Sequence, residues 1–472
     1  MHLKDSTTLG EGRGNAIYHV CRSREGEEIA EMLETPVKVR ELQRKLYQKA
    51  KQEKGYRFYL LYDKIYRMDI LSHAYRLVKA NKGAAGVDGE TFESMEEREG
   101  GAQKYLEDVA RELKRKEYKA SPVRRVYIPK ADGSKRPLGI PTVKDRIVQM
   151  AVKIVIEPIF EADFQENSYG FRPKRNAHQA VADVSRQLSS GKAQVIDADI
   201  TKYFDTIPHD KLLGLAAQRI VDKNILKLIK LWLTAPVVEE DNGRKKYKGN
   251  DKGTPQGGVI SPLLANIYLN VLDTVWKQRR VQERLGARLI RYADDAVAVC
   301  RDNTDRILKG MKTVLGELGL SLNEAKTKVV DARKEEFHFL GFAIGVRKSV
   351  VTGREFPLIH PSKKAMKHIR AEIKRLTDKS NCALPTDVVI RRVNEVVRGW
   401  TGYFRYGHCS RDMSALKRYL EERIQIYLRN KHGKRRHGFM CYPYHHLYDN
   451  LGLYKIPTSA LYQRTANADG RR

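Results

Sequence analysis

The strongest chemical signal in the sequence is the tetrapeptide Tyr292-Ala293-Asp294-Asp295, which lies between two short apolar runs. Two strands joined by a turn that carries the acids are the simplest arrangement for this pattern. Adjacent carboxylates repel each other, and a tight turn gives them little room to separate, so a divalent cation would make the arrangement favourable. Considered alone, the dipeptide is more often a solvated turn, because Asp is a common turn former.

A second apolar run, residues 194–200, also carries acids. Asp197 and Asp199 are two positions apart, so both side chains point to the same face of a strand and the spacing does not choose between them. Asp205 follows shortly afterwards. Carboxylates from two strands could hold two Mg²⁺ ions about 4 Å apart, which is the arrangement that metal-assisted phosphoryl transfer requires. The acids therefore favour a phosphoryl-transfer enzyme.

The charge of the chain indicates the kind of partner. Its 472 residues include 89 Lys and Arg against 58 Asp and Glu, a formal charge of +31. Such a surplus repels itself unless a polyanion neutralises it, and nucleic acid is the most plausible polyanion. A basic surface that aids solubility or rests on anionic lipid is the alternative that charge alone leaves open.

Cysteine spacing and hydropathy exclude several classes of protein. The five cysteines are too scattered for a CxxC zinc pair or a disulfide framework, so we expect reduced thiols and no structural zinc. The start of the chain lacks the apolar core of a signal peptide, and nowhere do about 18 apolar residues run together. We expect no membrane partner and a cytoplasmic protein, in the bacterial cytoplasm or nucleoid.

The N-terminal half must position the acids with several different elements. Residues 1–30 show no periodicity and are expected to be flexible. Residues 37–80 space apolar side chains three and four apart, as amphipathic helices do. The glycine-rich residues 81–90 predict a loop. Residues 123–141 predict two basic strands joined by an Asp-Gly turn.

The C-terminal half changes from a mixed to a helical pattern. Between residues 195 and 345 short apolar runs alternate with helix-like stretches, which indicates an α/β core. Beyond about residue 360 the sequence is helical and basic, and from about residue 430 it has no clear period. A chain of this length exceeds what one core usually organises, so we expect two or three domains.

A series of ordered motifs, not only YADD, resembles the reverse transcriptase and maturase proteins encoded by group II introns. YADD is the typical form of their active-site motif, and the likeness covers roughly residues 60–425. The other matching segments are KGAAGVDG (82–89), YIPKADGSKRPLGIPTVKDRIVQ (127–149), NSYGFRPKRNAHQA (167–180), DADITKYFDTIPHD (197–210), GTPQGGVISPLLANIYLN (253–270), LSLNEAKTKVV (320–330), FLGF (339–342) and RGWTGYF (398–404).

The resemblance implies which residues act in catalysis. Asp199, Asp294 and Asp295 would be catalytic and, together with Ile200, would bind two Mg²⁺ ions, with Mn²⁺ as a possible substitute. The choice of Asp199 over Asp197 comes from the family and not from the spacing.

The resemblance also assigns residues to the incoming nucleotide and to the nucleic acid. Lys130 and Arg136 would grip the triphosphate, and Tyr203, where many members have Phe, would exclude a 2′-hydroxyl by its bulk. Gln256 would lie in a glycine turn close to the nucleotide. The remaining assignments are a primer grip at Phe339, Leu340 and Gly341, and RNA-binding thumb residues Lys363, Lys364, Lys367 and Arg398.

The implied fold class is an α/β (α+β) right-hand polymerase, with a mixed or antiparallel sheet in fingers and palm, a helical thumb and a basic C-terminal tail. Its expected divisions are an N-terminal extension (1–75), fingers (76–180), palm (181–350), thumb or maturase domain (351–428) and a DNA-binding-like tail (429–472). The chain lacks the paired cysteines and histidines of the HNH endonuclease that some members append, so we expect no cutting of the second DNA strand.

The implied function is that of an RNA-directed DNA polymerase that also binds its parent group II intron RNA to promote splicing and mobility. Its expected partners are that intron RNA, an RNA template with a DNA primer, target DNA and dNTPs. Two alternatives remain: an RNA-binding maturase whose polymerase site is little used, and a reverse transcriptase that serves defence instead of an intron.

Overall fold

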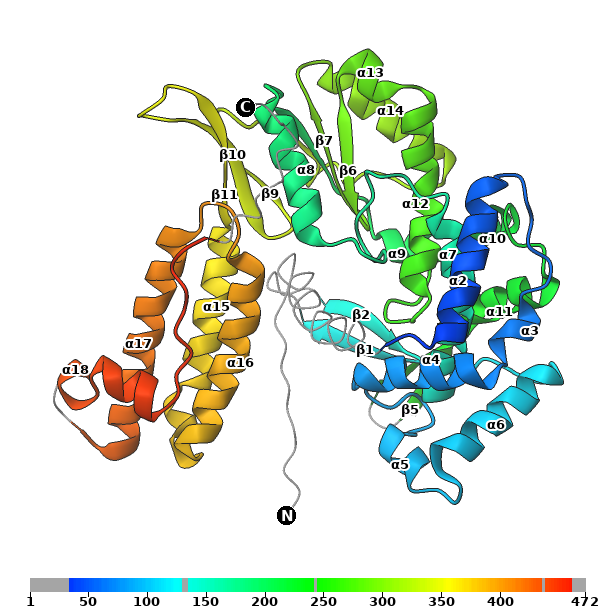
Figure 1. The fold of residues 1–472 in the computed structure, drawn as a ribbon, viewed down its shortest axis with the longest axis horizontal. Coiled ribbons are helices and arrows are strands. Elements are labelled where there is room, and N and C mark those ends of the chain that lie inside the picture. The colour runs from blue at the N-terminus through cyan, green and yellow to red at the C-terminus, as the bar shows by residue number, and fades with distance from the viewer. Residues whose placement is uncertain (1–33, 130–134, 242–243, 435–437, 461–472) are drawn as a thin grey trace. The chain divides into compact units, whose positions relative to one another are not determined.

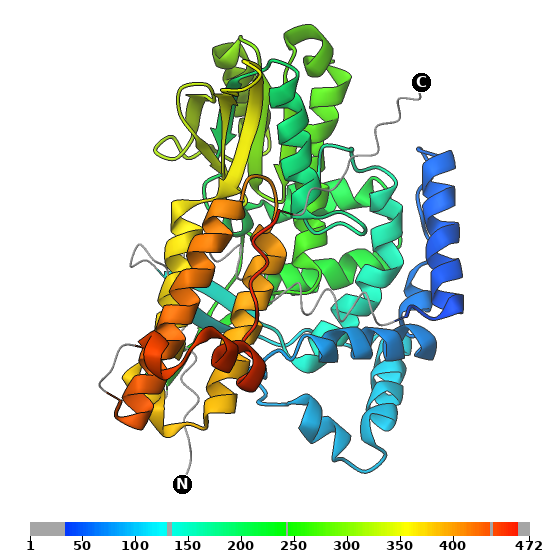
Figure 2. The same ribbon diagram turned by 60° about the vertical axis from the view of Figure 1, so that its left-hand side comes forward.

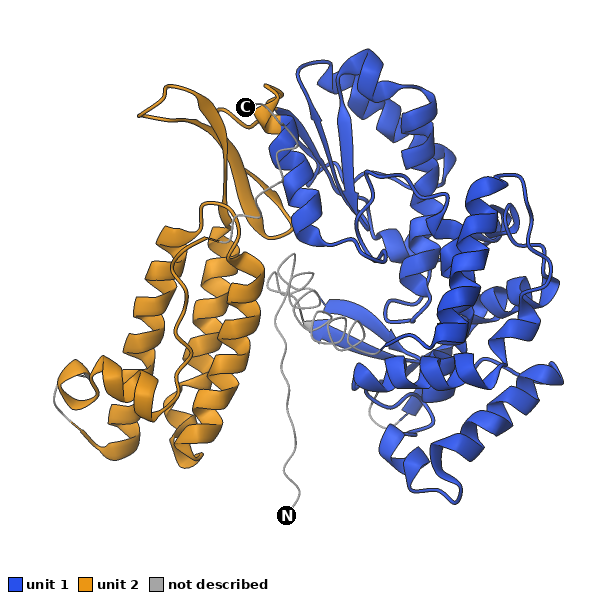
Figure 3. Ribbon diagram, viewed as in Figure 1, with its two compact units in different colours: residues 1–12, 22–187, 194–329 blue, residues 13–21, 188–193, 330–472 orange. Residues whose placement is uncertain are grey.

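The computed structural model describes residues 34–129, 135–241, 244–434 and 438–460. The expected flexible start and the predicted nucleotide ligand Lys130 lie outside these ranges. The chain forms two compact units (Figure 3). Of the described residues, 34–187 and 194–329 make up the first unit, and 188–193 and 330–460 make up the second.

The first unit begins with helices that surround a buried one, α7 (Val143–Glu161). Apolar residues occupy most sides of α7, as expected of a helix that is covered all round, and α2 (Val37–Gln52) and α4 (Met68–Ala80) pack against it. The sequence pattern thus predicted the helices at 37–80 correctly. The smaller helices of this region are α3 (Tyr62–Ile65), α5 (Phe92–Glu96) and α6 (Gly101–Lys114).

A four-stranded sheet follows, with the strand order β2-β1-β4-β5. The predicted basic hairpin is confirmed: β1 (Val123–Pro129) and β2 (Lys135–Ile140) pair antiparallel, so that Ile128 lies opposite Arg136. β4 (Val237–Asp241) joins β1 in parallel, and β5 (Arg244–Lys248) forms the far edge. The hairpin is therefore fixed to a strand that comes more than a hundred residues later.

The second sheet has the strand order β6-β7-β3-β8 and carries the acids. Its strands are β3 (Gln194–Ala198), β6 (Arg288–Tyr292), β7 (Asp295–Cys300) and β8 (Lys328–Asp331). Helix α14 (Thr304–Glu317) packs on β3, and α12 (Ser261–Gln278) packs on α14 (Figure 1). The other helices of this region are α8 (Ala177–Ser189), α9 (Tyr203–Thr206), α10 (His209–Ala217), α11 (Lys223–Thr234) and α13 (Val281–Leu285).

The second unit joins a small antiparallel sheet to a bundle of three long helices. The sheet has the order β11-β10-β9, and the helices α15, α16 and α17 lie side by side in Figures 1 and 2. The bounds are β9 (Phe337–Phe339), β10 (Phe342–Lys348), β11 (Glu355–Pro361), α15 (Lys363–Leu376), α16 (Thr386–Phe404) and α17 (Ser410–His432), with short helices η1 (Lys379–Ala383), α18 (Gly438–Cys441) and η2 (His446–Asn450).

The helical pattern beyond residue 360 is thus confirmed as a bundle, and α17 continues past residue 428. Within the described ranges, no helix is both long and apolar enough to cross a membrane.

Candidate active site

The YADD tetrapeptide forms the predicted hairpin turn. Tyr292 ends β6 and lies opposite Asp295 at the start of β7, and Ala293 between them has a left-handed φ of 56°. A left-handed residue lets the chain reverse within two positions. Asp294 and Asp295 therefore lie at one end of the sheet.

Strand β3 brings Asp199 to the same end. The antiparallel register pairs Ala198 with Ala296, so Asp199, the residue that follows β3, reaches the level of Asp295. Burial raises the pKa of Asp294, and the negative charge of Asp199 raises it further. Asp197, by contrast, pairs with Val297 farther along the strand and is not among the charges that act most strongly on Asp294.

These carboxylates suit a hard divalent cation, because Mg²⁺ prefers oxygen ligands. In the part of the chain that the structure describes, no three acidic, His or Cys side chains are already gathered as metal ligands. A lysine instead approaches the site, with Nζ of Lys326 3.7 Å from Oδ2 of Asp199. Asp199 and Asp294 are thus close enough to influence each other. Ile200, the other predicted metal ligand, forms an isolated antiparallel β-bridge with Leu322 through backbone hydrogen bonding.

A buried arginine side chain, Arg291, supports the YADD turn. The guanidinium of Arg291 donates to the carbonyl oxygen of Ala293 at 2.9 Å and forms an ion pair with Asp273 on α12, with no exposure of either side chain. Asn266 on the same helix accepts a further bond from Arg291 and donates to the carbonyl of Gly170. The turn is therefore held from α12 through a planar group that can donate in several directions.

Gly170, in the NSYGFRP motif, packs directly against this turn. A Cβ added at Gly170 would lie 2.4 Å from the backbone nitrogen of Ala293, closer than any real side chain can lie. The neighbouring Tyr169 also donates its backbone N–H to the carbonyl of Arg291 at 2.8 Å. Glycine is therefore required at position 170 for the loop to contact the turn.

Two of the predicted nucleotide ligands contact each other. Nε of Arg136 on β2 donates to Oε1 of Gln256 at 3.1 Å, and Nε2 of Gln256 lies 3.5 Å from both carboxylate oxygens of Asp205. The positive charge of Arg136 also lowers the pKa of Asp294, which burial raises overall. Arg136 therefore connects the basic hairpin electrostatically to the carboxylate turn.

Comparisons with known proteins identify the family of the chain. Residues 128–344 match the family "Reverse transcriptase (RNA-dependent DNA polymerase)", and residues 366–442 match "Group II intron, maturase-specific domain". Protein YkfC of Escherichia coli is 36% identical over 347 residues, which cover 66% of this chain and 89% of YkfC. The chain belongs to the group II intron-encoded reverse transcriptases and maturases.

Other relatives are proteins of introns. The group II intron-encoded protein LtrA of Lactococcus lactis is 40% identical over 219 residues, 46% of this chain and 35% of LtrA. An uncharacterized 91 kDa protein in the cob intron of Schizosaccharomyces pombe is 28% identical over 418 residues, 73% of this chain and 50% of that protein. The chain thus spans half or less of the length of these two relatives. Its enzyme class is RNA-directed DNA polymerase.

The glycine turn of this reverse transcriptase is docked on the basic hairpin. The backbone N–H of Gly139 on β2 donates to the carbonyl of Gln256 at 2.6 Å. Gly257 has a φ of 109°, and a Cβ added there would lie 2.4 Å from the carbonyl oxygen of Gly139. This turn therefore requires glycine both for its conformation and for the close approach.

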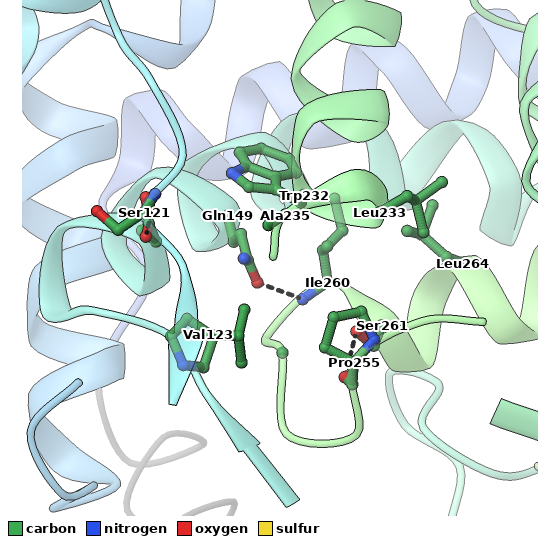
Figure 4. Close-up of a pocket in the computed structure, with 13 residues that line it drawn as sticks. Ser121, Val123, Gln149, Trp232, Leu233, Ala235, Pro255, Ile260, Ser261 and Leu264 are labelled. Carbon is green, nitrogen blue, oxygen red and sulfur yellow. Dashed lines mark hydrogen bonds between the residues drawn. The ribbon is translucent and has the colours of Figure 1, made fainter. Parts of the chain in front are cut away.

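A small pocket lies behind the glycine turn (Figure 4). Oε1 of Gln149 accepts the backbone N–H of Ile260 at 3.4 Å, and Oγ of Ser261 donates to the carbonyl of Pro255 at 3.0 Å. With a volume of about 10 Å³, the pocket has room for a single water molecule. It is thus part of the support of the turn and too small for a nucleotide.

Tyr203, predicted to exclude a 2′-hydroxyl, is only 2% exposed. Its hydroxyl donates to the carbonyl of Ala265 on α12 at 2.6 Å, and the charge of Asp294 is among the groups that act on its pKa, which burial raises. The ring is thus a buried side chain beside the carboxylates. This hydrogen bond gives the buried hydroxyl of Tyr203 the partner that it requires.

The predicted primer-grip residues form a tight turn in the second unit. Phe339 ends β9, and Leu340 and Gly341, with φ values of 50° and 82°, make the two-residue connection to β10. The hydroxyl of Tyr403 on α16 donates to the carbonyl of Leu340 at 2.9 Å. The RGWTGYF motif therefore holds this turn, and its Trp400 is buried in the core of the second unit.

The predicted RNA-binding residues all lie on the surface of the second unit. Lys363, Lys364 and Lys367 are exposed on the first turns of α15. Arg398 is exposed on α16, with its guanidinium carbon 5.2 Å from the centre of the Tyr454 ring. Arg398 thus also contacts the segment after α17, a contact that the sequence did not indicate.

Sequence reasoning missed the groups that support the site. The pair of Arg291 and Asp273 stood beside quoted motifs but received no role, and Asp205 was named only as an acid that follows Asp199. Lys326 likewise lies within LSLNEAKTKVV. Only its positive charge, inside a motif that the resemblance had identified, could have suggested a contact with the acids.

Proposed function

We propose that Asp199, Asp294 and Asp295 form the metal-binding site with which this reverse transcriptase extends a DNA primer on an RNA template. The observation that carries the proposal is the meeting of Asp199 at the end of β3 with Asp294 at the β6–β7 turn. The raised pKa of Asp294 reflects burial first and the charge of Asp199 second, and both costs fall when a cation neutralises the pair. Two Mg²⁺ ions, or Mn²⁺ in their place, would activate the primer 3′-hydroxyl and stabilise the leaving pyrophosphate.

The protein's own groups would position the incoming dNTP. Arg136 presents a guanidinium beside the carboxylates, suited to contact the triphosphate, and Gln256 holds that guanidinium through the 3.1 Å hydrogen bond. Lys130, which follows β1 in the sequence, would add a second positive charge. The bulk of Tyr203 would exclude a ribonucleotide, a discrimination by shape.

The second unit would bind the parent group II intron RNA and promote splicing and mobility. The maturase-specific domain matches residues 366–442, and exposed Lys363, Lys364 and Lys367 provide cations for phosphate contacts. Target DNA would be a further partner, and the bacterial cytoplasm or nucleoid would be the place of action. If the polymerase site were little used, this maturase role would remain.

Primer extension tests the proposed metal ligands. The protein is incubated with an RNA template, a DNA primer, dNTPs and Mg²⁺, and the rate is compared with those of Asp199→Asn and Asp294→Asn. Each change removes one negative oxygen ligand with little change of shape. We expect the rate to fall more than about a hundredfold. This exceeds the usual effect of losing a residue that contacts a metal ligand and not the metal itself.

Asp197→Asn is the matched control, because Asp197 lies on the same strand and the same face as Asp199. It should retain a rate within a few-fold of the original. Equal losses for Asp197→Asn and Asp199→Asn would contradict the assignment of Asp199. Full activity of Asp294→Asn would contradict the metal site itself.

A further inference from the structure

An open groove of about 490 Å³ lies in the second unit, between α17 and the segment that follows it. Three of the residues that line the groove are basic and two are tyrosines. None of the lining residues has been assigned a role in polymerisation. The lining residues are Ser414, Lys417, Arg418, Glu421, Tyr444, Tyr448, Lys455 and Thr458. The groove therefore combines positive charge with aromatic rings.

The charge in the groove is not cancelled within the protein. Its only acid, Glu421, accepts the hydroxyl of Tyr448 at 2.5 Å and lies 3.9 Å from Nζ of Lys417. Arg418 and Lys455 are exposed, and neither forms an ion pair with any residue that the structure describes. Two cations therefore face solvent at the groove.

An exposed aromatic platform lies beside these cations. The Tyr444 side chain is 49% exposed and contacts Phe439, itself 47% exposed, edge to face with ring centres 5.1 Å apart. Exposed rings of this size keep apolar surface in water unless a partner covers them. Because every nucleobase has a flat face, such a ring offers a stacking site that tolerates any base.

The groove wall is held in place by the bundle. Leu447 and Leu453 are buried, and Nε2 of Gln425 on α17 donates to the carbonyl of Tyr442 at 2.9 Å. Tyr448 lies on η2, a single π-helical turn, a rare conformation that is frequent at functional sites. The segment that showed no sequence period is therefore folded against α17.

We propose that this groove binds a single-stranded segment of nucleic acid, with a phosphate between Arg418 and Lys455 and a base stacked on Tyr444. The cations supply the attraction to phosphate, and the tyrosine supplies the stacking surface that single-strand sites combine with it. An acidic peptide would satisfy the cations but would leave the exposed ring without a flat partner. The site goes beyond the proposed polymerase function, and its binding is measured without any polymerisation.

Photo-crosslinking of short oligonucleotides to the full chain tests the site directly. Hexanucleotides with one 4-thiouridine (RNA) or 4-thiothymidine (DNA) are irradiated with the protein, and cross-linked peptides are mapped by mass spectrometry. We expect cross-links at residues 438–460, and the amount as a function of concentration gives the affinity of this site alone. Comparison of the two oligonucleotides tells whether RNA or DNA is the natural source.

Three variants separate the contributions. Tyr444→Ala should weaken the groove cross-link about tenfold, within the usual range for loss of one stacked base, whereas Tyr444→Phe should retain it. The double change Arg418→Ala/Lys455→Ala should weaken it and lower the slope of log affinity against log salt by about 1.4, for two single-strand phosphate contacts.

The matched control is Lys348→Ala/Arg354→Ala, which removes the same charge from exposed positions on β10 and the connection to β11. If this control weakens the groove cross-link as much as the groove variant does, the proposal is wrong. Cross-links confined to other segments, or displacement of the oligonucleotide by a glutamate-rich peptide at equal concentration, would also overturn it. Primer extension by the groove variants should stay at the original rate on a short template, which separates this site from the metal site.

Discussion

Arg291 and Asp273 form an ion pair in which neither side chain is exposed, with Nη2 of Arg291 2.5 Å from Oδ2 of Asp273. The same guanidinium donates to the carbonyl of Ala293, the residue between Tyr292 and Asp294. The pair therefore connects α12 to the conformation of the carboxylate turn. Removing one member would leave the other as an uncompensated buried charge.

Arg291→Met should be destabilising and should reduce polymerase activity. Breaking a buried ion pair costs about 3–5 kcal/mol, and the turn also loses its donor to Ala293. Urea unfolding of the first unit measures the stability, and primer extension measures the activity. Unchanged values of both would show that the pair has no such role.

The double variant Arg291→Met/Asp273→Leu distinguishes stability from positioning. Replacing both charges with apolar groups should recover much of the lost stability, because such replacements are often neutral. Primer extension should stay low, since Ala293 still lacks its donor. Recovery of the full rate would mean that Arg291 acts only through stability.

Gln256→Ala and Arg136→Ala should each raise KM for dNTP about tenfold with a smaller effect on kcat. Both residues belong to one hydrogen-bonded chain from β2 to Asp205, so each supports the other. The double variant should therefore cost less than the product of the two single effects. Steady-state kinetics with Lys248→Ala, an exposed change on β5, as the control check this. Fully multiplicative effects would contradict the coupling.

Tyr203→Ala should raise the incorporation of ribonucleotides relative to deoxyribonucleotides, because the bulk at this position is lost. Tyr203→Phe should keep the discrimination and lose about 1 kcal/mol of stability, since the carbonyl of Ala265 loses its donor. The measurement is the ratio of kcat/KM for dNTP and rNTP, which does not depend on the fraction of folded enzyme. An unchanged ratio in Tyr203→Ala would contradict the prediction that Tyr203 excludes ribonucleotides.

The second unit should lose stability as the pH falls below about 6.5. Burial lowers the pKa of His408, and the nearby His360 lowers it further, while Nδ1 of His408 accepts the backbone N–H of Ile359 at 3.4 Å. The unfolded chain then binds more protons than the folded one, so the free energy of unfolding decreases as the pH decreases. Thermal unfolding at pH 7.5 and 5.5 should show a smaller loss for His408→Gln than for the original protein. An equal loss would assign the effect to other groups.

The local elements of the active site could be predicted from the sequence. Apolar runs on both sides of Asp294 and Asp295 predicted β6 and β7, and the Asp-Gly turn predicted the β1–β2 hairpin. The choice of Asp199 needed the family, because Asp197 shares its face. The structure adds a physical reason, since the register of β3 carries Asp199 to the end of the sheet.

The long-range supports could not be predicted. Arg291 and Asp273 lie on a strand and a helix that only the tertiary fold brings together, and nothing in their spacing pairs them. The segment after α17 was expected to be a basic tail, because its buried residues Leu447, Leu453 and Ile456 follow neither a helical nor a strand period. Its order comes from contacts with α17 and not from a local pattern.

Substitutions in the two units should affect splicing and reverse transcription independently. Asp294→Asn should lose primer extension but still promote splicing of the parent intron, because the ribozyme supplies the splicing chemistry. The triple change Lys363→Ala/Lys364→Ala/Lys367→Ala should weaken intron binding and lower its salt slope by up to about 2.7, for three phosphate contacts.

The matched control for this triple change removes three exposed cations elsewhere in the second unit, Lys348, Arg354 and Lys379. Filter binding at several salt concentrations and a splicing assay with the parent intron compare the two triple variants. The cluster on α15 should matter because three cations on adjacent turns of one helix can follow a phosphate backbone, whereas the control positions are scattered over separate elements. Equal loss in both variants would mean that net charge, and not this face of α15, holds the RNA.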